Sequence, residues 1–525
     1  MAFNSFAYHL LVLYFFFSFS LVSPAQISNF KLPLKAVNLG NWLVIERWMK
    51  PSLFDEIPNN ELLCYYDGTQ IQLKSTKFQK YLTAENGGGA SVVANRDSAS
   101  GWETFKLRRI DENTFNLRVF KKQFLNKDPD TRIVAISNAG ENLEPFQILK
   151  QNGSRRQVGN NIEYRVRIEA PNGLFLQVKS DTEVTADYAG SRWEDENPSV
   201  FIMTILSDKN LGGEYQLTNG YGPTRAPQVL QDHRNSYITE QDFSFLLSKG
   251  LNAVRIPVGW WIIYDSPPKP FVGGSLQALD NAFTWAQKYG IKVVVDLHAL
   301  KASQNGNEHS GSRDGYKEWG NSNIQETVDV IDFLAKRYAN HQSLIAIELM
   351  NEPWAEDDTG GIPLDTLTEY YRAGHNAVRK YTSNAYVILS NRLGGGANRK
   401  ELLPFASGLG DDRVVIDVHF YNAFEPKFDN MSIGDNINYI YGQRASELKE
   451  VTTSNRLPLI FVEEWSASWG NQNVGTGKDH ENFANAQIEV YERGANFGWA
   501  FWSYKVKDNE YWSLQQMIEN YHLNL

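Results

Sequence analysis

The 525-residue sequence predicts an α/β fold: a (β/α)8 TIM barrel that is interrupted after its first strand by a β-rich domain. Three observations support this prediction. Eight short apolar runs recur along the chain. Segments with helical spacing of apolar residues separate most of these runs. One long stretch, between the first and second runs, breaks the alternation with short β-like runs and Asn/Gly/Asp turns but no long helical pattern.

The eight apolar runs are typical of strands buried on both faces, because most are rich in Val and Ile and lack alternating polar residues. They are Ala36–Leu39, Ala253–Val258, Lys292–Leu297, Leu344–Leu349, Tyr386–Leu389, Val414–Val418, Leu459–Val462 and Trp499–Trp502. Eight such strands alternating with helices favour a barrel. The alternative is an open doubly wound sheet, which would need a Gly-rich phosphate turn after its first strand. Leu39-Gly40-Asn41-Trp42 is not such a turn.

Helices are predicted between most of these strands. The first begins after Thr239, a good N-cap residue, and ends at Gly250. A second carries apolar residues at helical spacing from Leu276 to Ala286 and ends at Gly290. Further helical patterns lie near Ile324–Tyr338, Leu364–Tyr381, Ile437–Val451 and Asn482–Arg493.

The interrupting segment contains a weak internal repeat, in which an aromatic-Leu pair is followed by a Phe within an apolar run. The three copies are Tyr81-Leu82 with Phe105, Phe124-Leu125 with Phe146, and Phe175-Leu176 with Phe201. Three copies of about 45 residues predict a β-trefoil, which is closed by threefold repetition. The segment resembles the fascin-like trefoil domain. A β insert of another topology is the alternative.

The N-terminal segment from Phe6 to Val22 is nearly all apolar and is followed by Ser23-Pro24-Ala25, with small residues suited to cleavage after Ala25. A signal peptide is therefore predicted. A signal anchor is the alternative, because no Lys or Arg precedes the apolar run. No other run approaches the roughly 20 apolar residues of a membrane span. We expect a secreted protein, located extracellularly, in the cell wall or in the vacuolar lumen, with glycosylation sequons at Asn152 and Asn430.

These boundaries predict a signal peptide at 1–25, a barrel formed by 26–60 and 207–525, and an inserted domain at 61–206. The formal net charge is −10 and no large Lys/Arg cluster is present, which argues against a nucleic-acid partner. Cys64 is the single cysteine, so no intramolecular disulfide can form. The sequence has no His-x-x-x-His pair or Cys cluster, so we expect no metal site. We also expect no cofactor and a monomeric protein.

Two carboxylates directly follow or end predicted strands, where barrel enzymes place their chemistry. Glu352 stands in Asn351-Glu352-Pro353 after the fourth strand, and Glu464 follows the seventh. A glycosidase needs such a pair, one acid to protonate the leaving oxygen and one carboxylate to attack the anomeric carbon. The acid should have a raised pKa and the nucleophile should stay ionised. Surface charges or salt-bridge partners are the alternative for both residues.

Polar or aromatic residues recur at the ends of the other strands as well. They are Glu46, Arg255, Asp296, His298, Asn391, His419, Tyr421 and Trp502. Buried polar groups are costly unless they have partners, so a ring of them indicates a solvated site. Aromatic residues form 13% of the chain, and their faces can stack on sugars as well as fill a core.

At these positions the sequence resembles glycoside hydrolase family 5, in particular the branch with fungal exo-β-1,3-glucanases and their plant relatives. The matching stretches are Val37–Glu46, Asn252–Trp261, Asp296–His298, Ser303–Gly306, Asn351–Pro353, Asp417–Tyr421, Glu464–Ser466 and Gly498–Trp502. They cover essentially all of the barrel. A family 5 barrel with a fascin-like insert resembles a plant subgroup.

The resemblance implies a retaining double displacement with Glu352 as acid/base and Glu464 as nucleophile. It implies that Asn351 binds the sugar 2-OH and that Arg255 keeps the nucleophile ionised. The other implied contacts are His419 and Tyr421, which orient the carboxylates; Glu46 and His298, which bind sugar hydroxyls; Trp502, the stacking floor; and Phe424, which lines the neighbouring subsite. Trp502 could instead be barrel core, and Phe424 an ordinary loop aromatic.

The sequence departs from the family pattern at three places. Glu463 replaces the usual Gly before the nucleophile, and strand alternation predicts that its side chain points toward the helix layer. Leu300-Lys301-Ala302 replaces a stretch that usually contains Pro and Gly, so that loop should change conformation. Asn307 stands in place of an aromatic clamp. We therefore expect an altered leaving-group subsite.

The predicted function is a secreted retaining glycoside hydrolase of the exo-β-1,3-glucosidase or β-glucosidase type. Its expected substrates are a β-glucan, an oligosaccharide or a small glucoside. A transglycosidase, or an endo-glucanase or mannanase, on the same scaffold is the enzymatic alternative. A catalytically weak carbohydrate-binding protein is the alternative of another class, favoured by Glu463 and the changed loop.

Overall fold

The computed structural model describes residues 31–57, 67–111, 113–138, 143, 145–206, 211–452, 457–470 and 475–525. The predicted signal peptide and Cys64 lie outside these residues. Residues Leu32–Leu525 pack as one unit. Among the residues described, no helix is both long and apolar enough to cross a membrane.

Eight parallel strands close into a barrel, as the sequence predicts. They are β1 (Leu34–Asn38), β15 (Ala253–Gly259), β16 (Lys292–Ala299), β17 (Leu344–Glu348), β18 (Tyr386–Ser390), β19 (Val414–His419), β20 (Leu459–Glu464) and β21 (Gly498–Phe501). Strand β1 pairs with β15 on one side and with β21 on the other. An open sheet is therefore the wrong alternative, because the sheet has no free edge.

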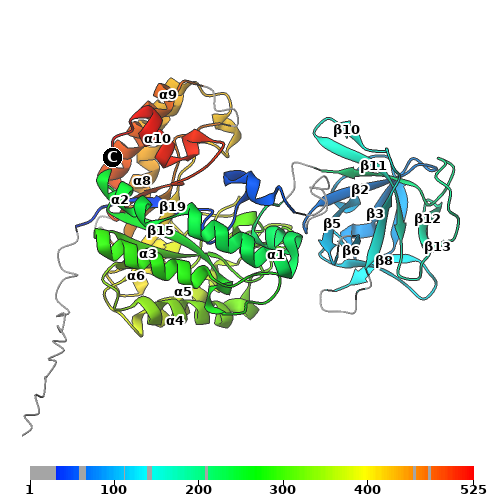
Figure 1. Ribbon diagram of the computed structural model, residues 1–525, viewed down its shortest axis with the longest axis horizontal. Coiled ribbons are helices and arrows are strands. Elements are labelled where there is room, and N and C mark those ends of the chain that lie inside the picture. Colours follow the sequence, from blue (N-terminus) through cyan, green and yellow to red (C-terminus); the bar gives the residue numbers. More distant parts are fainter. Residues whose placement is uncertain are drawn as a thin grey trace, which may run out of the picture. The chain divides into compact units, whose positions relative to one another are not determined.

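Helices surround the barrel on its outside (Figure 1). The predicted ones are α2 (Glu240–Ser248), α3 (Ser275–Tyr289), α4 (Ile324–Tyr338), α5 (Leu364–Arg379) and α9 (Gly477–Gly494). Thr239 and Asp242 form a capping box at the start of α2, and Gly290 ends α3 with a φ of 69°. The pattern at 437–451 is divided into α7 (Ile433–Tyr439) and α8 (Ala445–Val451) by a π-helical turn.

Three further helices carry no clear sequence signal: α1 (Glu214–Tyr237), α6 (Leu403–Gly408) and α10 (Leu514–Tyr521). Helix α1 is interrupted at Gly222, which has a φ of 74°, and contains Pro223 and Pro227. Proline removes a backbone donor and usually ends or bends a helix, so the sequence of α1 does not look helical.

The insert is built mainly of strands (Figure 1), with two short 3-10 turns at Glu85–Gly87 and Gly101–Glu103. The strands are β2 (Gln70–Ser75), β3 (Tyr81–Ala84), β4 (Val92–Arg96), β5 (Thr104–Arg109), β6 (Thr114–Arg118), β7 (Phe124–Lys127), β8 (Ile133–Ser137), β9 (Phe146–Lys150), β10 (Arg156–Val158), β11 (Asn161–Glu169), β12 (Phe175–Ser180), β13 (Glu183–Tyr188) and β14 (Phe201–Ile205). Six of them pair in a ring, in the order β2, β5, β6, β9, β11, β14 and back to β2. The pairs β3/β4, β7/β8 and β12/β13 are hairpins outside this ring.

The barrel and the insert have separate hydrophobic cores. In the insert, the repeated residues Phe105, Phe146 and Phe201 are all buried together. Because each domain has its own core, we expect each to have a stability of its own.

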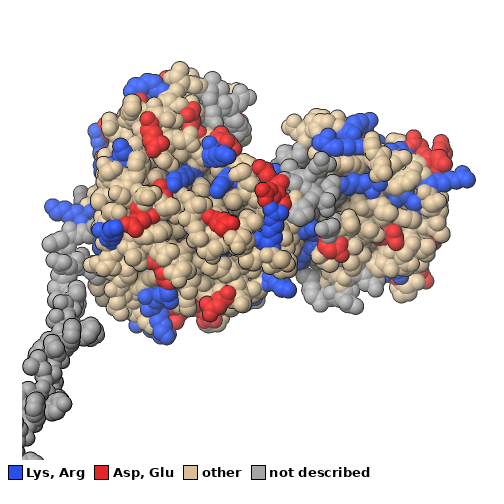
Figure 2. Space-filling view, viewed as in Figure 1, with Lys and Arg blue, Asp and Glu red and all other residues tan. Residues whose placement is uncertain are grey.

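On the face drawn in Figure 2, basic and acidic side chains are scattered among uncharged ones.

Candidate active site

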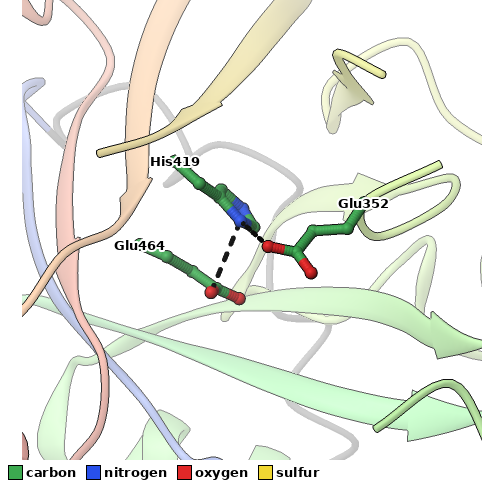
Figure 3. A group of neighbouring side chains, drawn as sticks. All are labelled: Glu352, His419 and Glu464. Atoms are coloured by element: carbon green, nitrogen blue, oxygen red, sulfur yellow. Dashed lines mark hydrogen bonds and ion pairs between the residues drawn. The ribbon is translucent and has the colours of Figure 1, made fainter. Parts of the chain in front are cut away.

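Glu352 and Glu464 face each other at the carboxyl ends of two barrel strands. Glu464 is the last residue of β20, and Glu352 follows β17 with a φ of 46°. Oxygens of both carboxyl groups and a ring nitrogen of His419 lie within 4.8 Å of one another (Figure 3). Retaining glycosidases hold their carboxyl groups about 5 Å apart, whereas inverting enzymes need more than about 6.5 Å to admit a water molecule. The spacing therefore fits a retaining reaction.

Glu464 is held by two donors from other parts of the barrel. The guanidinium of Arg255 on β15 lies 3.0 Å from one oxygen, and the Tyr421 hydroxyl donates to the other at 2.8 Å. Hydrogen bonds and charge from these groups stabilise an anion at Glu464. This pattern suits a carboxylate that attacks a sugar.

His419, the last residue of β19, lies between the two carboxyl groups. Its Nδ1 is 2.8 Å from Glu352 Oε1 and 3.4 Å from Glu464 Oε2, and its Nε2 is 3.0 Å from Asp417. Burial lowers the pKa of His419, but the charges of Asp417 and Glu464 outweigh burial and raise it well above its usual value. The imidazole is therefore a cation that links the acidic groups.

The pKa values of the two glutamates are pushed apart. Burial raises the pKa of Glu464 to about 7, although the charge of His419 opposes this. Burial also raises the pKa of Glu352, but the hydrogen bond and charge of His419 prevail and lower it to about 2. In the site without substrate, Glu464 thus has the higher pKa and Glu352 the lower one, whereas the sequence analysis expects the raised pKa at the acid, Glu352. Between about pH 2 and pH 7 the two carboxyl groups together hold a single proton.

Arg255 is also the centre of a buried acidic cluster. Besides Glu464, its guanidinium contacts Asp296 at 3.1 Å, Glu348 at 2.8 Å and Glu463 at 2.9 Å, and all three side chains are fully buried. Burial raises the pKa of Glu348 and Glu463 well above the usual value. Four carboxyl groups crowd around this one guanidinium, so protonation of some of them lowers the repulsion among them.

The prediction that Glu463 points toward the helix layer is wrong. Val418 pairs with Val462, but the next pair is His419 with Glu464, so Glu463 is an extra residue on its strand. Such a bulge breaks the alternation of side chains. Glu463 and Glu464 consequently both reach the same guanidinium.

Trp502 and His298, two of the predicted sugar contacts, lie beside each other. Their rings are stacked, with centroids 5.5 Å apart and planes within 7°. Asp296 contacts His298 Nδ1 at 2.6 Å, and among the described residues His298 Nε2 has no hydrogen-bond partner. Burial lowers the pKa of His298 well below its usual value, so the ring is neutral. A neutral ring nitrogen that lacks a partner can accept a hydrogen bond from a sugar hydroxyl.

The other predicted contacts surround this centre. Asn351 accepts from Arg255 at 2.8 Å, and the buried Glu46 accepts from Trp48 at 2.9 Å. Phe424 is 72% exposed and lies edge-on to Tyr421, with ring centroids 5.2 Å apart. The structure therefore brings all ten predicted residues to this end of the barrel.

The loop after β16 holds a residue that the sequence reasoning missed. His309 Nε2 lies 3.3 Å from Glu352 Oε2. In the same loop Ala302 and Ser303 have φ values of 68° and 62°, and Gln304 donates to the carbonyls of His298 and Asn351. A loop has no periodicity that could have pointed to His309. Trp512, which stacks on Tyr421 at 5.3 Å, was missed for the same reason.

Two family models match the chain. One, described as Cellulase (glycosyl hydrolase family 5), matches residues 220–508, more than half of the chain. The other, described as a domain of unknown function (DUF7910), matches residues 59–206.

Curated relatives agree with the first of these models, and one solved structure shares its fold. A probable glucan 1,3-beta-glucosidase A of Aspergillus clavatus is 31% identical over 360 residues, which are 62% of this chain and 82% of the relative. A glucan 1,3-beta-glucosidase of Pichia angusta is 29% identical over 397 residues, 66% of this chain and 90% of the relative. A rutinosidase structure from Aspergillus niger has a TM-score of 0.50 at 19% identity, covering 59% of this chain and 89% of that one, and shows the fold alone.

Proposed function

The chain belongs to glycosyl hydrolase family 5, whose members are retaining glycosidases, and on this premise we propose that it is an exo-acting β-1,3-glucosidase or β-glucosidase. The observation that carries the proposal is the short spacing of Glu352 and Glu464, whose oxygens lie within 4.8 Å. That spacing supports direct attack by one carboxylate, because an inverting enzyme needs a wider separation to hold a water molecule.

In the proposed reaction the single proton shared by the pair moves from Glu464 to Glu352 when the substrate binds. Glu464 then attacks the anomeric carbon while Glu352 gives this proton to the leaving oxygen. The bond from sugar to aglycone breaks as the bond from sugar to Glu464 forms. A water molecule then gives a proton to Glu352 and its oxygen to the sugar, which releases Glu464. Arg255 and Tyr421 hold Glu464 in place, and Asn351 binds the 2-OH as the ring flattens.

The proposed sugar site is formed by Trp502, His298 and Glu46. The exposed Phe424 lies beside Tyr421 and the buried Trp512. Names of the relatives support glucose with a β-1,3 linkage as the sugar. Transfer of the sugar to an alcohol instead of water uses the same two steps, and an endo-acting glucanase or mannanase remains the enzymatic alternative.

The test is a screen of aryl β-glycosides and laminari-oligosaccharides, with Glu464→Ala as the control. We expect release of glucose from the chain end, with activity lost in the control by a factor of about 10⁴ or more. Loss of polymer viscosity before glucose appears would favour an endo-acting enzyme. No turnover on any glycoside would overturn the proposal.

For the insert we infer a β-trefoil of the fascin-like type, with boundaries at 61–206, in a plant subgroup of the family. The six-strand ring, the three hairpins and the shared burial of Phe105, Phe146 and Phe201 support this topology. We also propose secretion after cleavage of residues 1–25 and glycosylation at the exposed Asn152 and Asn430. The working protein is proposed to be a monomer.

A further inference from the structure

The loop between β16 and α4 connects the acid/base to the insert. His309 lies in the short 3-10 turn Glu308–Ser310 of this loop. It contacts Glu352 Oε2 at 3.3 Å, while His419 contacts the other oxygen of the same carboxyl group. The position of His309 therefore determines how one of the two oxygens of Glu352 is held.

Arg118 on insert strand β6 binds the same loop further along. Its side chain is only 1% exposed, and its guanidinium lies 2.9 Å from Asp314 and 2.6 Å from Glu318. Arg108 on β5 also contacts Asp314, at 2.5 Å. A buried charge that loses its partner is strongly destabilising, so these contacts fix the loop to the insert.

Tyr316 adds a second attachment between the same two segments. Its hydroxyl donates to the carbonyl of Val119 at 2.6 Å. Its ring lies under two insert cations, Lys106 at 3.9 Å and Arg118 at 4.4 Å from the ring centroid. The stretch from Asp314 to Glu318 therefore lies against the insert over its whole length.

The chain that follows the insert holds the other end of the loop. The backbone N–H of Gly212 donates to Glu308 at 2.7 Å. Gln216 donates to the carbonyls of Ser312 and Arg313, at 2.9 Å each. His309 is thus enclosed between two stretches that depend on the insert and its connection to the barrel.

We propose that the insert positions His309 against Glu352, so that the insert is a working part of the active site. Arg118 is the positioning residue that fixes the loop, and His309 transmits its effect to the acid/base. The role of Glu352 in this statement rests on the function proposed above. The attachment of the loop does not.

The effect should depend on the leaving group. Protonation by a positioned acid contributes about 10²- to 10⁴-fold for a poor leaving group, and little for an activated one. We expect Arg118→Ala and His309→Ala each to lower kcat/KM at least tenfold on laminaribiose. On a dinitrophenyl glucoside the loss should stay below about threefold. Arg156→Ala is the matched control, because Arg156 is an insert arginine paired with Glu163 on the surface.

A double-mutant cycle then tests the coupling. If Arg118 acts through His309, the double variant is no worse than His309→Ala alone. Losses that multiply, or equal losses on both substrates, would overturn the proposal.

Hydrogen exchange of the loop provides a readout that needs no activity. Glu318→Gln keeps the Arg118–Asp314 pair and is a mild variant that should fold even where Arg118→Ala does not. We expect the peptides around 305–318 to exchange faster in Glu318→Gln and Arg118→Ala than in wild type, and at the wild-type rate in Arg156→Ala. Wild-type exchange rates in both Glu318→Gln and Arg118→Ala would contradict the positioning role. Absence of turnover in the wild-type protein would instead contradict the proposed function.

Discussion

Arg255 is the cation around which the buried carboxyl groups of the site are arranged. Its guanidinium is fully buried and contacts Asp296, Glu348, Glu463 and Glu464. Burial lowers the pKa of Arg255, but the surrounding carboxylates prevail and raise it well above the usual value. The cation is therefore permanent, whereas the number of charged carboxyl groups around it depends on pH.

Glu463→Gln should change how stability depends on pH. Burial raises the pKa of Glu463 in the folded protein, so the folded state keeps a proton that the unfolded state loses above about pH 4.5. The free energy of unfolding therefore falls as pH rises above about 4.5, by up to about 1.4 kcal/mol per pH unit, until the folded protein also loses this proton. The advantage of the Gln variant over wild type should consequently grow from pH 5 to pH 8 in thermal unfolding.

The control is Glu450→Gln, since Glu450 is 56% exposed and forms only a long pair of 3.8 Å with Lys400. Its difference from wild type should stay constant over the same range. A constant difference for Glu463→Gln would show that Glu463 is charged in the fold.

The coupled pair Glu352 and Glu464 predicts the alkaline limb of activity. The pair loses its last proton near the pKa of Glu464, about 7. Above this pH kcat/KM on an unactivated glucoside should fall about tenfold per unit, because no acid is left for the leaving oxygen. In Glu352→Gln, with a dinitrophenyl glucoside, the limb should disappear. If kcat/KM of Glu352→Gln still falls at alkaline pH, a group other than the Glu352–Glu464 pair is responsible for the fall.

At the scale of elements, close contact between strand ends shapes the sugar site. A Cβ on Gly40, two residues after β1, would lie 3.0 Å from the Trp502 ring and 3.0 Å from Ser503 Oγ. Gly40→Ala should therefore displace the indole floor and lower kcat/KM on glucosides about tenfold, mainly through KM. Gly395→Ala is the control, since no heavy atom lies within 4 Å of its Cβ. Equal kcat/KM values for Gly40→Ala and Gly395→Ala would show that Trp502 does not bind the sugar.

The barrel strands were predictable because burial on both faces leaves a continuous apolar run in the sequence. The polar residues at their ends were predictable for the related reason that they interrupt such runs. The direction of Glu463 was not, because one extra residue in β20 reverses the alternation. Helix α1 was hidden by Pro223 and Pro227, and His309 by its place in an aperiodic loop.

At the scale of the whole molecule, the two separate cores predict two unfolding steps. Phe105→Ala removes a fully buried ring of the insert and should cost about 3–5 kcal/mol. In calorimetry the transition of the insert should move to lower temperature by more than that of the barrel, which keeps its own core but loses its ion pairs with the insert when the insert unfolds. Ile136→Ala, at a side chain that is 52% exposed, is the control and should move neither. A single transition that shifts as a whole would show that the domains unfold together.

The central claim is that a sugar is transferred to Glu464 in a retaining reaction at the end of β20. The most direct measurement is trapping with an activated 2-fluoro glucoside, followed by peptide fragmentation in a mass spectrometer. We expect one covalent label per molecule, on Glu464 and not on the adjacent Glu463. A label on Glu352 or Glu463, or no label in a protein that turns over glucosides, would contradict it.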